Sequence, residues 1–154
     1  MAETILLVED EEKLARMVEL ELRYEGYEVE KAFDGRTGLE RALSGSFDLV
    51  LLDLMLPGLT GEEFITRIRR GRTMPIIVLS AKAGLEDKVN VLRLGADDFI
   101  PKPFDNLEVL ARVEAQLRRV EDVLAQAVDE ARKGGFSLSE LQELLTLLYQ
   151  GDEL

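Results

Sequence analysis

The chain has 154 residues, of which 46% are hydrophobic and 32% charged, a balance that suits one compact domain with a modest appendage and excludes a large multidomain enzyme. Its 31 acidic and 19 basic residues give a formal net charge of −12, which repels nucleic-acid phosphates and anionic lipid. The absence of cysteine and histidine excludes thiol and imidazole catalysis, disulfides and Cys/His zinc sites. Because the longest apolar run near the start is four residues, we expect a soluble, cytoplasmic protein with no membrane span.

Five short apolar runs predict five β-strands. The runs at 5–8, 49–52 and 76–79 are continuously apolar, the run at 27–30 alternates like an edge strand, and the run at 98–100 is shorter. Continuous runs are typical of strands buried on both faces of a parallel sheet. The intervening stretches carry apolar residues at helical spacing, namely Leu14, Met17, Val18, Leu22, Leu39, Ala42, Leu43, Phe64, Ile65, Ile68, Val89, Leu92 and Leu94. This alternation predicts a three-layer α/β domain.

After the fifth run, apolar residues recur at alternating steps of three and four. That spacing is a heptad seam, formed by Leu110, Val113, Leu117, Val120, Leu124, Ala127 and Ala131. We expect one helix that begins as the fifth helix of the domain and continues to a turn at Gly134-Gly135. Ser137 stands three residues before Glu140, which predicts a capping box and a final helix over 138–150.

Composition also divides the chain into a domain at 1–120 and a helical tail at 121–154. Each part has a net charge of −6, but the tail holds only two basic residues against eight acidic ones. This balance argues against a DNA-reading helix and for a protein-contacting one. The final helix has too many leucines for a solvated helix of its length, so we expect the tail to need a partner.

Polar side chains directly follow four of the predicted strands. Glu9 and Asp10 follow the first, Asp53 the third, Ser80 the fourth and Lys102 the fifth. The carboxyl ends of parallel strands meet at one edge of the sheet, where such folds bind ligands. Clustered carboxylates repel one another unless a cation lies between them, and oxygen ligands without His or Cys favour Mg²⁺. The sequence therefore predicts a magnesium-dependent phosphoryl site.

Some of these residues also have a purely structural interpretation. Asp10 could cap the first helix, Asp53 could be a turn residue, and Lys102 could be a solvated loop lysine. The functional interpretation is favoured because all the polar residues fall at the end of the sheet where ligands bind.

Four blocks of sequence resemble the CheY-like receiver domain of two-component response regulators, specifically the OmpR/PhoB kind. The blocks at 5–11, 51–58, 78–82 and 95–104 read ILLVEDE, LLDLMLPG, VLSAK and GADDFIPKPF. The resemblance spans residues 3 to about 119. It implies a (βα)5 flavodoxin-like, doubly wound parallel sheet with strand order 2-1-3-4-5, to which the tail adds a C-terminal helical extension.

The resemblance implies roles for the residues at the strand ends. Asp53 is the expected phosphoacceptor for a sensor histidine kinase. Glu9 and Asp10 are expected to hold Mg²⁺ together with Asp53 and the main-chain oxygen of Met55. Lys102 would pair with the phosphoryl oxygens. We expect no enzyme activity apart from slow autophosphatase activity.

The resemblance also implies how phosphorylation is transmitted. Ser80 would donate its hydroxyl to the phosphoryl group, and Phe99 would swing inward as Ser80 moves. Receivers of this kind dimerise through the fourth helix, fifth strand and fifth helix. Three ion pairs are expected across that face, and their partners are all present here: Lys88 with Glu108, Asp98 with Arg112, and Asp97 with Arg119. We expect a homodimer favoured by phosphorylation.

The tail departs from the family pattern, which normally continues into a winged-helix DNA-binding domain. We expect instead a helical hairpin that packs on itself or on a second copy, or that docks on a protein partner, and its glutamates argue against DNA binding by this chain. Three functions remain open. They are a phosphorylation switch acting through the tail on a protein, a transcription regulator whose tail is part of an unusual DNA-binding unit, and a phosphorelay intermediate.

Overall fold

A five-stranded parallel sheet lies at the centre of the computed structural model, which describes residues 2–151 apart from the side chain of Arg119. The strands pair in the order β2-β1-β3-β4-β5, and every pairing is parallel. Their bounds are β1 (Thr4–Val8), β2 (Glu28–Ala32), β3 (Leu49–Asp53), β4 (Ile76–Ser80) and β5 (Asp98–Pro101). The predicted fold class and strand order are confirmed.

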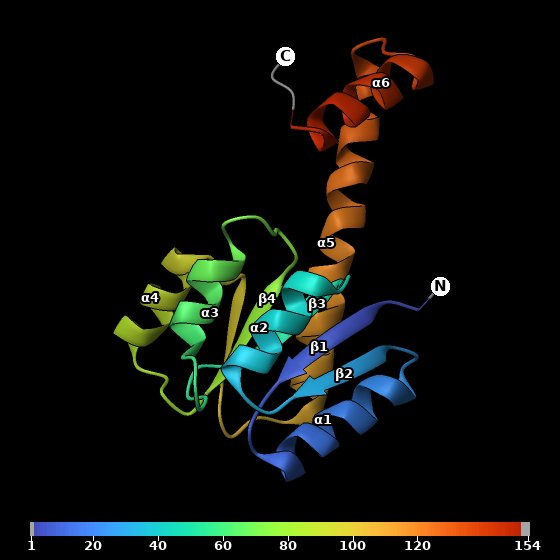
Figure 1. Cartoon of the computed structure of the whole chain (residues 1–154). Helices are drawn as coiled ribbons and strands as arrows, with labels where there is room; N and C mark the ends of the chain where they lie inside the picture. Colours follow the sequence, from blue (N-terminus) through green and yellow to red (C-terminus); the bar gives the residue numbers. More distant parts are fainter. Residues whose placement is uncertain (1, 152–154) are drawn as a thin grey trace. The chain divides into compact units, whose positions relative to one another are not determined.

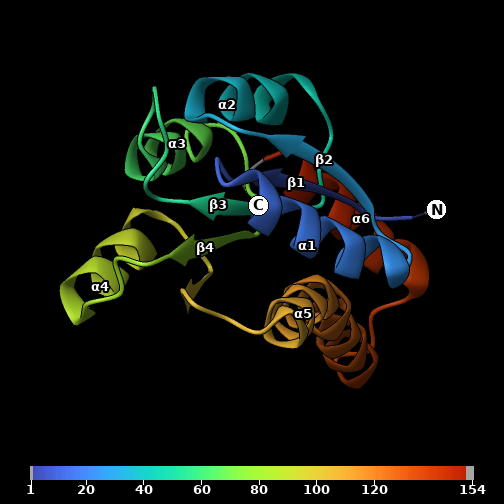
Figure 2. The same ribbon diagram turned by 90° about the horizontal axis from the view of Figure 1, so that it is seen from below.

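Helices cover both faces of this sheet (Figure 1). Figure 2 shows α1 and the start of α5 on one face, and α2, α3 and α4 on the other. Their bounds are α1 (Glu12–Tyr24), α2 (Gly35–Ser44), α3 (Gly61–Ile68), α4 (Leu85–Leu94) and α5 (Asn106–Lys133). Among residues 2–151, no helix is long and apolar enough to cross a membrane.

Each face of the sheet has its own apolar core. Phe64 belongs to the core under α2, α3 and α4, whereas Val18 and Val113 belong to the core under α1 and α5. Successive strand residues point to opposite faces, so Leu6 enters the first core and Leu7 the second. Burial on both faces explains why the central strands are continuously apolar in sequence.

The position of β2 corrects one prediction. The strand covers Glu28–Ala32, where the sequence predicted 27–30. The backbone N–H of Tyr27 donates to the carbonyl of Leu22, so Tyr27 still belongs to the turn after α1. The strand therefore starts one residue later and ends two residues later than its alternation suggested.

The buried helix faces are narrower than the apolar spacing predicted. Met17 and Leu43 follow the helical spacing of the apolar residues but are exposed. In α4 the buried residue is Val91, whereas Val89 and Leu92 are exposed. Helical spacing identifies an apolar stripe, but the packing of each helix on the sheet decides which edge of that stripe is covered.

The chain divides into two compact units, one ending at Leu117 and the other beginning at Arg118. The second unit contains the last part of α5 and the helix α6 (Leu138–Tyr149). Gly135 between them has a φ of +78°, a left-handed conformation that glycine adopts at little cost. The predicted capping box is confirmed, because Ser137 Oγ accepts from the N–H of Glu140 at 3.1 Å and the Glu140 carboxylate accepts from the N–H of Ser137 at 3.3 Å.

A charged cluster ties α1 to β2. Glu19 on α1 is buried and lies 3.0 Å from Lys31 Nζ and 3.2 Å from Arg23 Nε. Arg23 also donates to the carbonyl of Val29 at 2.6 Å. Burial raises the pKa of the Glu19 carboxyl, but its hydrogen bonds with Lys31 and Arg23 outweigh that effect, so the pKa lies below its usual value.

Glu19→Gln should destabilise the protein by about 1–3 kcal/mol at neutral pH, because it leaves partly buried cations without their partner. A lowered folded-state pKa means that the carboxylate stabilises the fold above its unfolded-state pKa, and that this contribution is lost as the pH falls through the folded-state value. Urea unfolding at neutral and acidic pH measures the difference between variant and wild type. The exposed Glu40→Gln is the control, and a Glu19→Gln deficit that is equal at both pH values would contradict the expectation.

Candidate functional site

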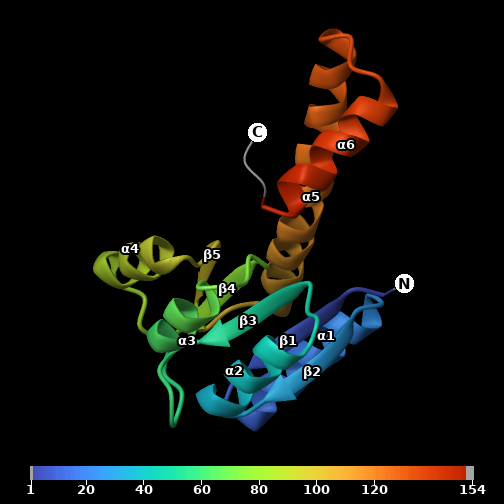
Figure 3. The same ribbon diagram turned by 45° about the horizontal axis from the view of Figure 1, so that its top comes forward.

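The predicted site residues meet at the carboxyl edge of the sheet. β1 and β3 are adjacent and parallel, which brings Glu9, the residue after β1, close to Asp53 at the end of β3. Figure 3 shows β3 lying between β1 and β4. Ser80 ends β4 and Lys102 follows β5 directly, so these two strands bring a hydroxyl and an ammonium group to the same edge.

Glu9, Asp10 and Asp53 form an acidic cluster. One carboxylate oxygen of each lies within 4.8 Å of the other two. Glu9 and Asp53 are buried, whereas Asp10 is exposed. A set of oxygen donors that is part buried and part open to water fits Mg²⁺, which takes a few carboxylates and keeps several waters.

The capping interpretation of Asp10 is wrong. The N-cap residue of α1 is Glu11, and no side chain makes a capping hydrogen bond there. The Asp10 carboxylate is therefore not used by the helix and instead belongs to the acidic cluster.

Lys102 joins the two buried carboxylates. Its Nζ donates to Glu9 Oε1 at 2.5 Å and to Asp53 Oδ2 at 3.0 Å. Burial lowers the pKa of the Lys102 ammonium, but its hydrogen bonds to Glu9 and Asp53 raise the pKa by more, so the net shift is upward. Lys102 is thus a charged group of the site and not a solvated loop lysine.

Glu9 is the carboxyl group whose titration the site changes most. Burial raises its pKa, and repulsion from Asp53 adds to the rise. Hydrogen bonds from Lys102 and from the N–H of Glu11 oppose it, and the resulting pKa is about 7. A cation in the cluster favours the ionised form, so occupancy by a metal and deprotonation of Glu9 are expected to reinforce one another.

Backbone groups fix the orientation of Asp53 and Ser80. The N–H of Met55 donates to Asp53 Oδ1 at 3.1 Å, and the N–H of Lys82 donates to Ser80 Oγ at 3.0 Å. The N–H of Lys102 donates to the carbonyl of Ser80 at 2.9 Å. Ser80 is fully buried and the Met55 side chain is exposed. The roles predicted for the Met55 carbonyl and the Ser80 hydroxyl stay predictions.

Phe99 already lies inside the domain. Its side chain is 7% exposed and belongs to the core under α2, α3 and α4. The ammonium of Lys88 lies 5.7 Å from the centre of the Phe99 ring, within range of a cation–π interaction. The inward movement predicted for Phe99 stays a prediction, and the inward position itself is the one seen here.

The charges predicted to join two copies have partners within this chain. Arg112 Nη1 lies 3.0 Å from Asp98 Oδ1, and Arg112 Nη2 lies 3.4 Å from Glu108 Oε1. Asp97 Oδ2 lies 2.9 Å from Arg69 Nη2. The side chain of Arg119, the predicted partner of Asp97, lies outside the described residues. The intermolecular pairs therefore remain a prediction.

Sequence reasoning missed Arg69. Its guanidinium donates to the carbonyls of Gly95 and Met74 at 2.9 and 2.7 Å as well as to Asp97. Burial lowers the pKa of this guanidinium and Asp97 opposes that effect. An arginine directly after α3 gave no signal of the contacts with Gly95 and Asp97, because these two residues lie more than twenty positions further along the chain.

Sequence reasoning placed Asp10 and the main-chain oxygen of Met55 at the site, but it missed the side chains, those of Met55 and Lys82 among them, that line the approach to it. A groove of about 490 Å³ lies beside the acidic cluster and is lined by Asp10, Leu54, Met55, Leu56, Pro57, Thr60, Glu62 and Lys82. Lys82 stands two residues after Ser80 and Met55 two residues after Asp53. That shared offset from the strand ends was the signal that could have identified both.

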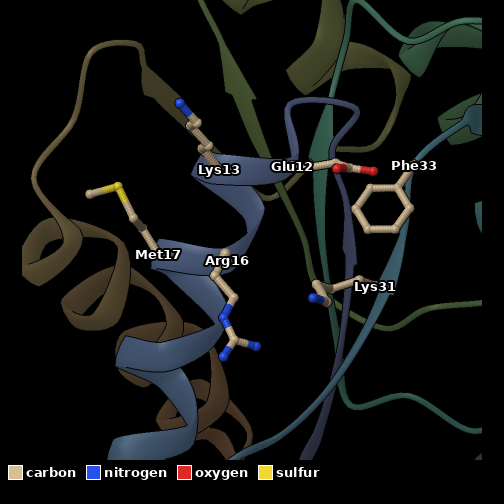
Figure 4. A pocket seen from close by; sticks show the side chains of 6 residues that line it. All are labelled: Glu12, Lys13, Arg16, Met17, Lys31 and Phe33. Carbon is tan, nitrogen blue, oxygen red and sulfur yellow. The ribbon is translucent and has the colours of Figure 1, made fainter.

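A second depression lies between α1 and the segment around the end of β2. It has a volume of about 650 Å³ and is lined by residues of α1 and of the end of β2 (Figure 4), namely Glu12, Lys13, Arg16, Met17, Lys31 and Phe33. Lys31 is engaged there by Glu19 and by the Phe33 ring, at 3.0 Å from the carboxylate and 5.9 Å from the ring centre. None of the predicted phosphoryl-site residues lines this depression.

The fold and the carboxylate–lysine cluster define a receiver domain of the CheY-like class. The chain matches the response regulator receiver domain family over residues 5–114, and it belongs to that family. The predicted resemblance is thereby confirmed, and the chain is a receiver-domain protein of two-component signalling.

Individual relatives agree with this membership. The chain is 56% identical over 115 residues to the response regulator ArlR of Staphylococcus saprophyticus, covering 75% of this chain and 52% of ArlR. It is 53% identical over 115 residues to ArlR of Staphylococcus aureus strain Mu50, with the same coverage. The chain thus spans about half the length of the curated relatives it matches.

Solved structures show the same fold. A CheY-like receiver domain from Methanospirillum hungatei superposes with a TM-score of 0.75 at 31% identity, covering 79% of this chain and 98% of that one. Thermotoga maritima DrrB, described as an OmpR/PhoB homologue, superposes with a TM-score of 0.72 at 30% identity, covering 77% of this chain and 54% of DrrB.

Gly61→Ala should distort the loop that carries Asp53 and should destabilise the protein by about 1–3 kcal/mol. A Cβ at Gly61 would lie 2.6 Å from the Cα of Leu54 and 2.9 Å from the carbonyl oxygen of Asp53, distances that force the backbone to move. Thermal unfolding measures the loss, and backbone amide shifts of Met55 report the displacement. Gly71→Ala is the matched control, because nothing lies within 4 Å of a Cβ there; equal stability of the two variants would contradict the prediction.

Proposed function

We propose that this chain is a phosphorylation switch in which Asp53 accepts a phosphoryl group from a sensor histidine kinase with the help of Mg²⁺. The observation that carries this proposal is the position of Asp53. Its carboxylate is buried at the end of a central strand, clustered with Glu9 and Asp10 and held by the Lys102 ammonium at 3.0 Å.

The transfer needs little from the protein beyond position and charge. An oxygen of the ionised Asp53 carboxylate attacks the phosphorus of a phosphohistidine, forming a P–O bond as the P–N bond breaks. The electron pair of the broken bond returns to the imidazole nitrogen of the kinase. Because the attacking carboxylate is already ionised, it needs no general base. The groove beside the cluster, open at Met55 and Lys82, is the route by which the phosphodonor reaches Asp53.

Glu9, Asp10, Asp53 and the main-chain oxygen of Met55 are the residues that would hold Mg²⁺. When bound, the ion supplies positive charge next to the transferred oxygens. Lys102 provides a second positive charge at Asp53 Oδ2, and Ser80 would donate its hydroxyl to a phosphoryl oxygen. The same groups leave the acyl phosphate open to water, which accounts for a slow autophosphatase activity.

The proposed output is a closer association of two copies. Phosphorylation adds about −1.5 to −2 charges at Asp53, which draws Ser80 and Lys102 inward and favours the buried position of Phe99. Lys88 lies over the Phe99 ring and belongs to the predicted dimer face, with Asp98, Glu108 and Arg112. A change at the ring therefore reaches that face through Lys88.

Asp53→Asn should abolish phosphorylation and leave the fold intact, because the amide retains the shape of the side chain but is not a nucleophile. Wild type incubated with acetyl phosphate and Mg²⁺ should gain one phosphoryl group, measured by intact mass spectrometry, and chelation of the metal should prevent the gain. The exposed Asp122→Asn is the control and should be labelled like wild type. Retained labelling of Asp53→Asn would overturn the assignment of the site.

Beryllofluoride with Mg²⁺, which mimics the phosphorylated carboxylate, should lower the dissociation constant of the dimer, as measured by analytical ultracentrifugation. Arg112→Ala should remove most of that gain and leave the dissociation constant of the unmodified protein unchanged. Exposed ion pairs are individually weak, so we expect roughly a fivefold loss of affinity.

Arg67→Ala is the matched control for this measurement. Arg67 on α3 pairs with Glu63 four residues earlier, as Arg112 pairs with Glu108, and the two arginines are similarly exposed. Equal effects of the two substitutions would place the phosphorylation-dependent contact elsewhere.

A further inference from the structure

The second unit leaves most of its apolar side chains uncovered. Among the described side chains from Arg118 onward, only Ala131 is buried. Nine large apolar side chains of this unit are between 39% and 90% exposed: Val120, Val123, Leu124, Val128, Phe136, Leu138, Leu145, Leu148 and Tyr149. A two-helix unit of this size cannot bury a sufficient core by itself, so the hairpin needs further apolar surface to cover it.

Four of these exposed apolar side chains line a groove between the two helices of the unit. α6 runs back beside the last part of α5 (Figures 1 and 3). The groove has a volume of about 540 Å³ and is lined by Val120, Leu124, Leu145, Thr146, Tyr149 and Gln150. No charged residue lines it. We call this groove the tail groove.

We propose that the tail groove binds the tail groove of a second copy of this chain, so that two hairpins form a four-helix bundle. This contact is distinct from the proposed phosphorylation-dependent dimer face, and it does not depend on the state of Asp53.

The shape of the surface favours a second copy as the occupant. The same short segment of α6 supplies both a wall of the groove, through Leu145 and Tyr149, and a projecting side chain, since Tyr149 is 90% exposed. A two-fold axis would place the projecting residues of each copy in the groove of the other, and such self-complementarity is what an isologous dimer requires.

The available area matches what a dimer needs. A stable interface buries about 800 Å² on each partner, and one large aromatic side chain alone can bury about 150–250 Å². Nine large exposed apolar side chains on one small unit can supply this area. Coverage of the groove also accounts for the leucines of α6, which a solvated helix would not carry.

The distribution of charge argues against other occupants. Glu140 and Glu143 are the only charged residues of α6, and both lie in its first half. The groove therefore offers no carboxylate that would select a basic helix. The tail is acidic as a whole, with two basic and eight acidic residues over 121–154, so it repels nucleic acid and anionic membranes. Two copies can meet at the groove because their like charges lie outside it.

Tyr149→Glu tests the proposal in the unphosphorylated chain of 154 residues. Sedimentation equilibrium of wild type should show a dimer that forms without any phosphodonor. Tyr149→Glu should weaken that dimer by roughly tenfold or more, because a central aromatic contact is replaced by a buried charge. Since Tyr149 is 90% exposed in the single chain, the substitution should leave the circular dichroism spectrum and melting temperature of the receiver unit unchanged.

Tyr24→Glu is the matched control. Tyr24 lies at the end of α1 and is 87% exposed, so it has the same chemistry and exposure on the other unit, and its substitution should leave the dissociation constant unchanged. A wild type that stays monomeric at high concentration would overturn the proposal, as would a Tyr149→Glu dimer as tight as that of wild type. A monomeric wild type whose tail binds an added amphipathic helical peptide would assign the groove to a different partner.

Cross-linking gives a second, independent readout. The chain has no cysteine, so Thr146→Cys places a single thiol at the groove and Ser44→Cys places one on α2. A short bis-maleimide should link two copies of the Thr146→Cys variant and should not link two copies of the Ser44→Cys variant. Repeating both measurements in the Asp53→Asn background separates the two proposals, because the tail dimer should persist there. If wild type fails to gain a phosphoryl group at Asp53, that result concerns only the phosphorylation site.

Discussion

The Lys102 ammonium is the interaction on which the site depends. Its Nζ lies within 3.0 Å of carboxylate oxygens of both Glu9 and Asp53, and burying two carboxylates together is costly unless a positive charge compensates them. Compensation is only partial, since burial and Asp53 still raise the pKa of Glu9 to about 7. The site therefore carries negative charge that Lys102 does not fully compensate, and a divalent cation can supply the remaining positive charge. The Mg²⁺ of the proposed function would supply that positive charge at the cluster of Glu9, Asp10 and Asp53.

Strand order explains why these groups meet. In the order β2-β1-β3-β4-β5, the chain leaves β1 in the direction of β2 and leaves β3 in the direction of β4. The loops after the adjacent strands β1 and β3 therefore diverge and leave a crevice between them. Glu9 and Asp53 stand at the two sides of that crevice, and β5 brings Lys102 to the same carboxyl end of the sheet. Side chains that are far apart in sequence are placed by the topology alone, which leaves only their orientation to local hydrogen bonds such as that from the N–H of Met55.

The fold and the composition of the site were predictable, because both follow from short-range patterns. Buried strands are visible as apolar runs, and parallel pairing brings the residues after them to one edge. Features that depend on long-range packing were not predictable. The choice of Val91 over Val89 as the buried residue of α4 is set by how that helix rests on the sheet, and the contact of Arg69 with Asp97 joins two loops that no sequence spacing relates. The failure of Asp10 to cap α1 is similar, since its neighbours across the sheet decide its role.

α5 links the two proposed associations because it is one uninterrupted helix over Asn106–Lys133. Its start packs Val109 and Val113 into the receiver core, its outer side carries Arg112 of the proposed phosphorylation-dependent face, and its end carries Leu124 of the tail groove. Two contacts on one pair of chains reinforce one another, since the first to form makes the second intramolecular. If the tail holds two copies together at all times, their receiver faces are already at high effective concentration. Weak surface ion pairs are then sufficient for association of these faces to respond to a modest change at Asp53. Weak pairs such as Arg112 with Asp98 are suited to that role, because a strong interface would close without the phosphoryl group and the switch would lose its dependence on it.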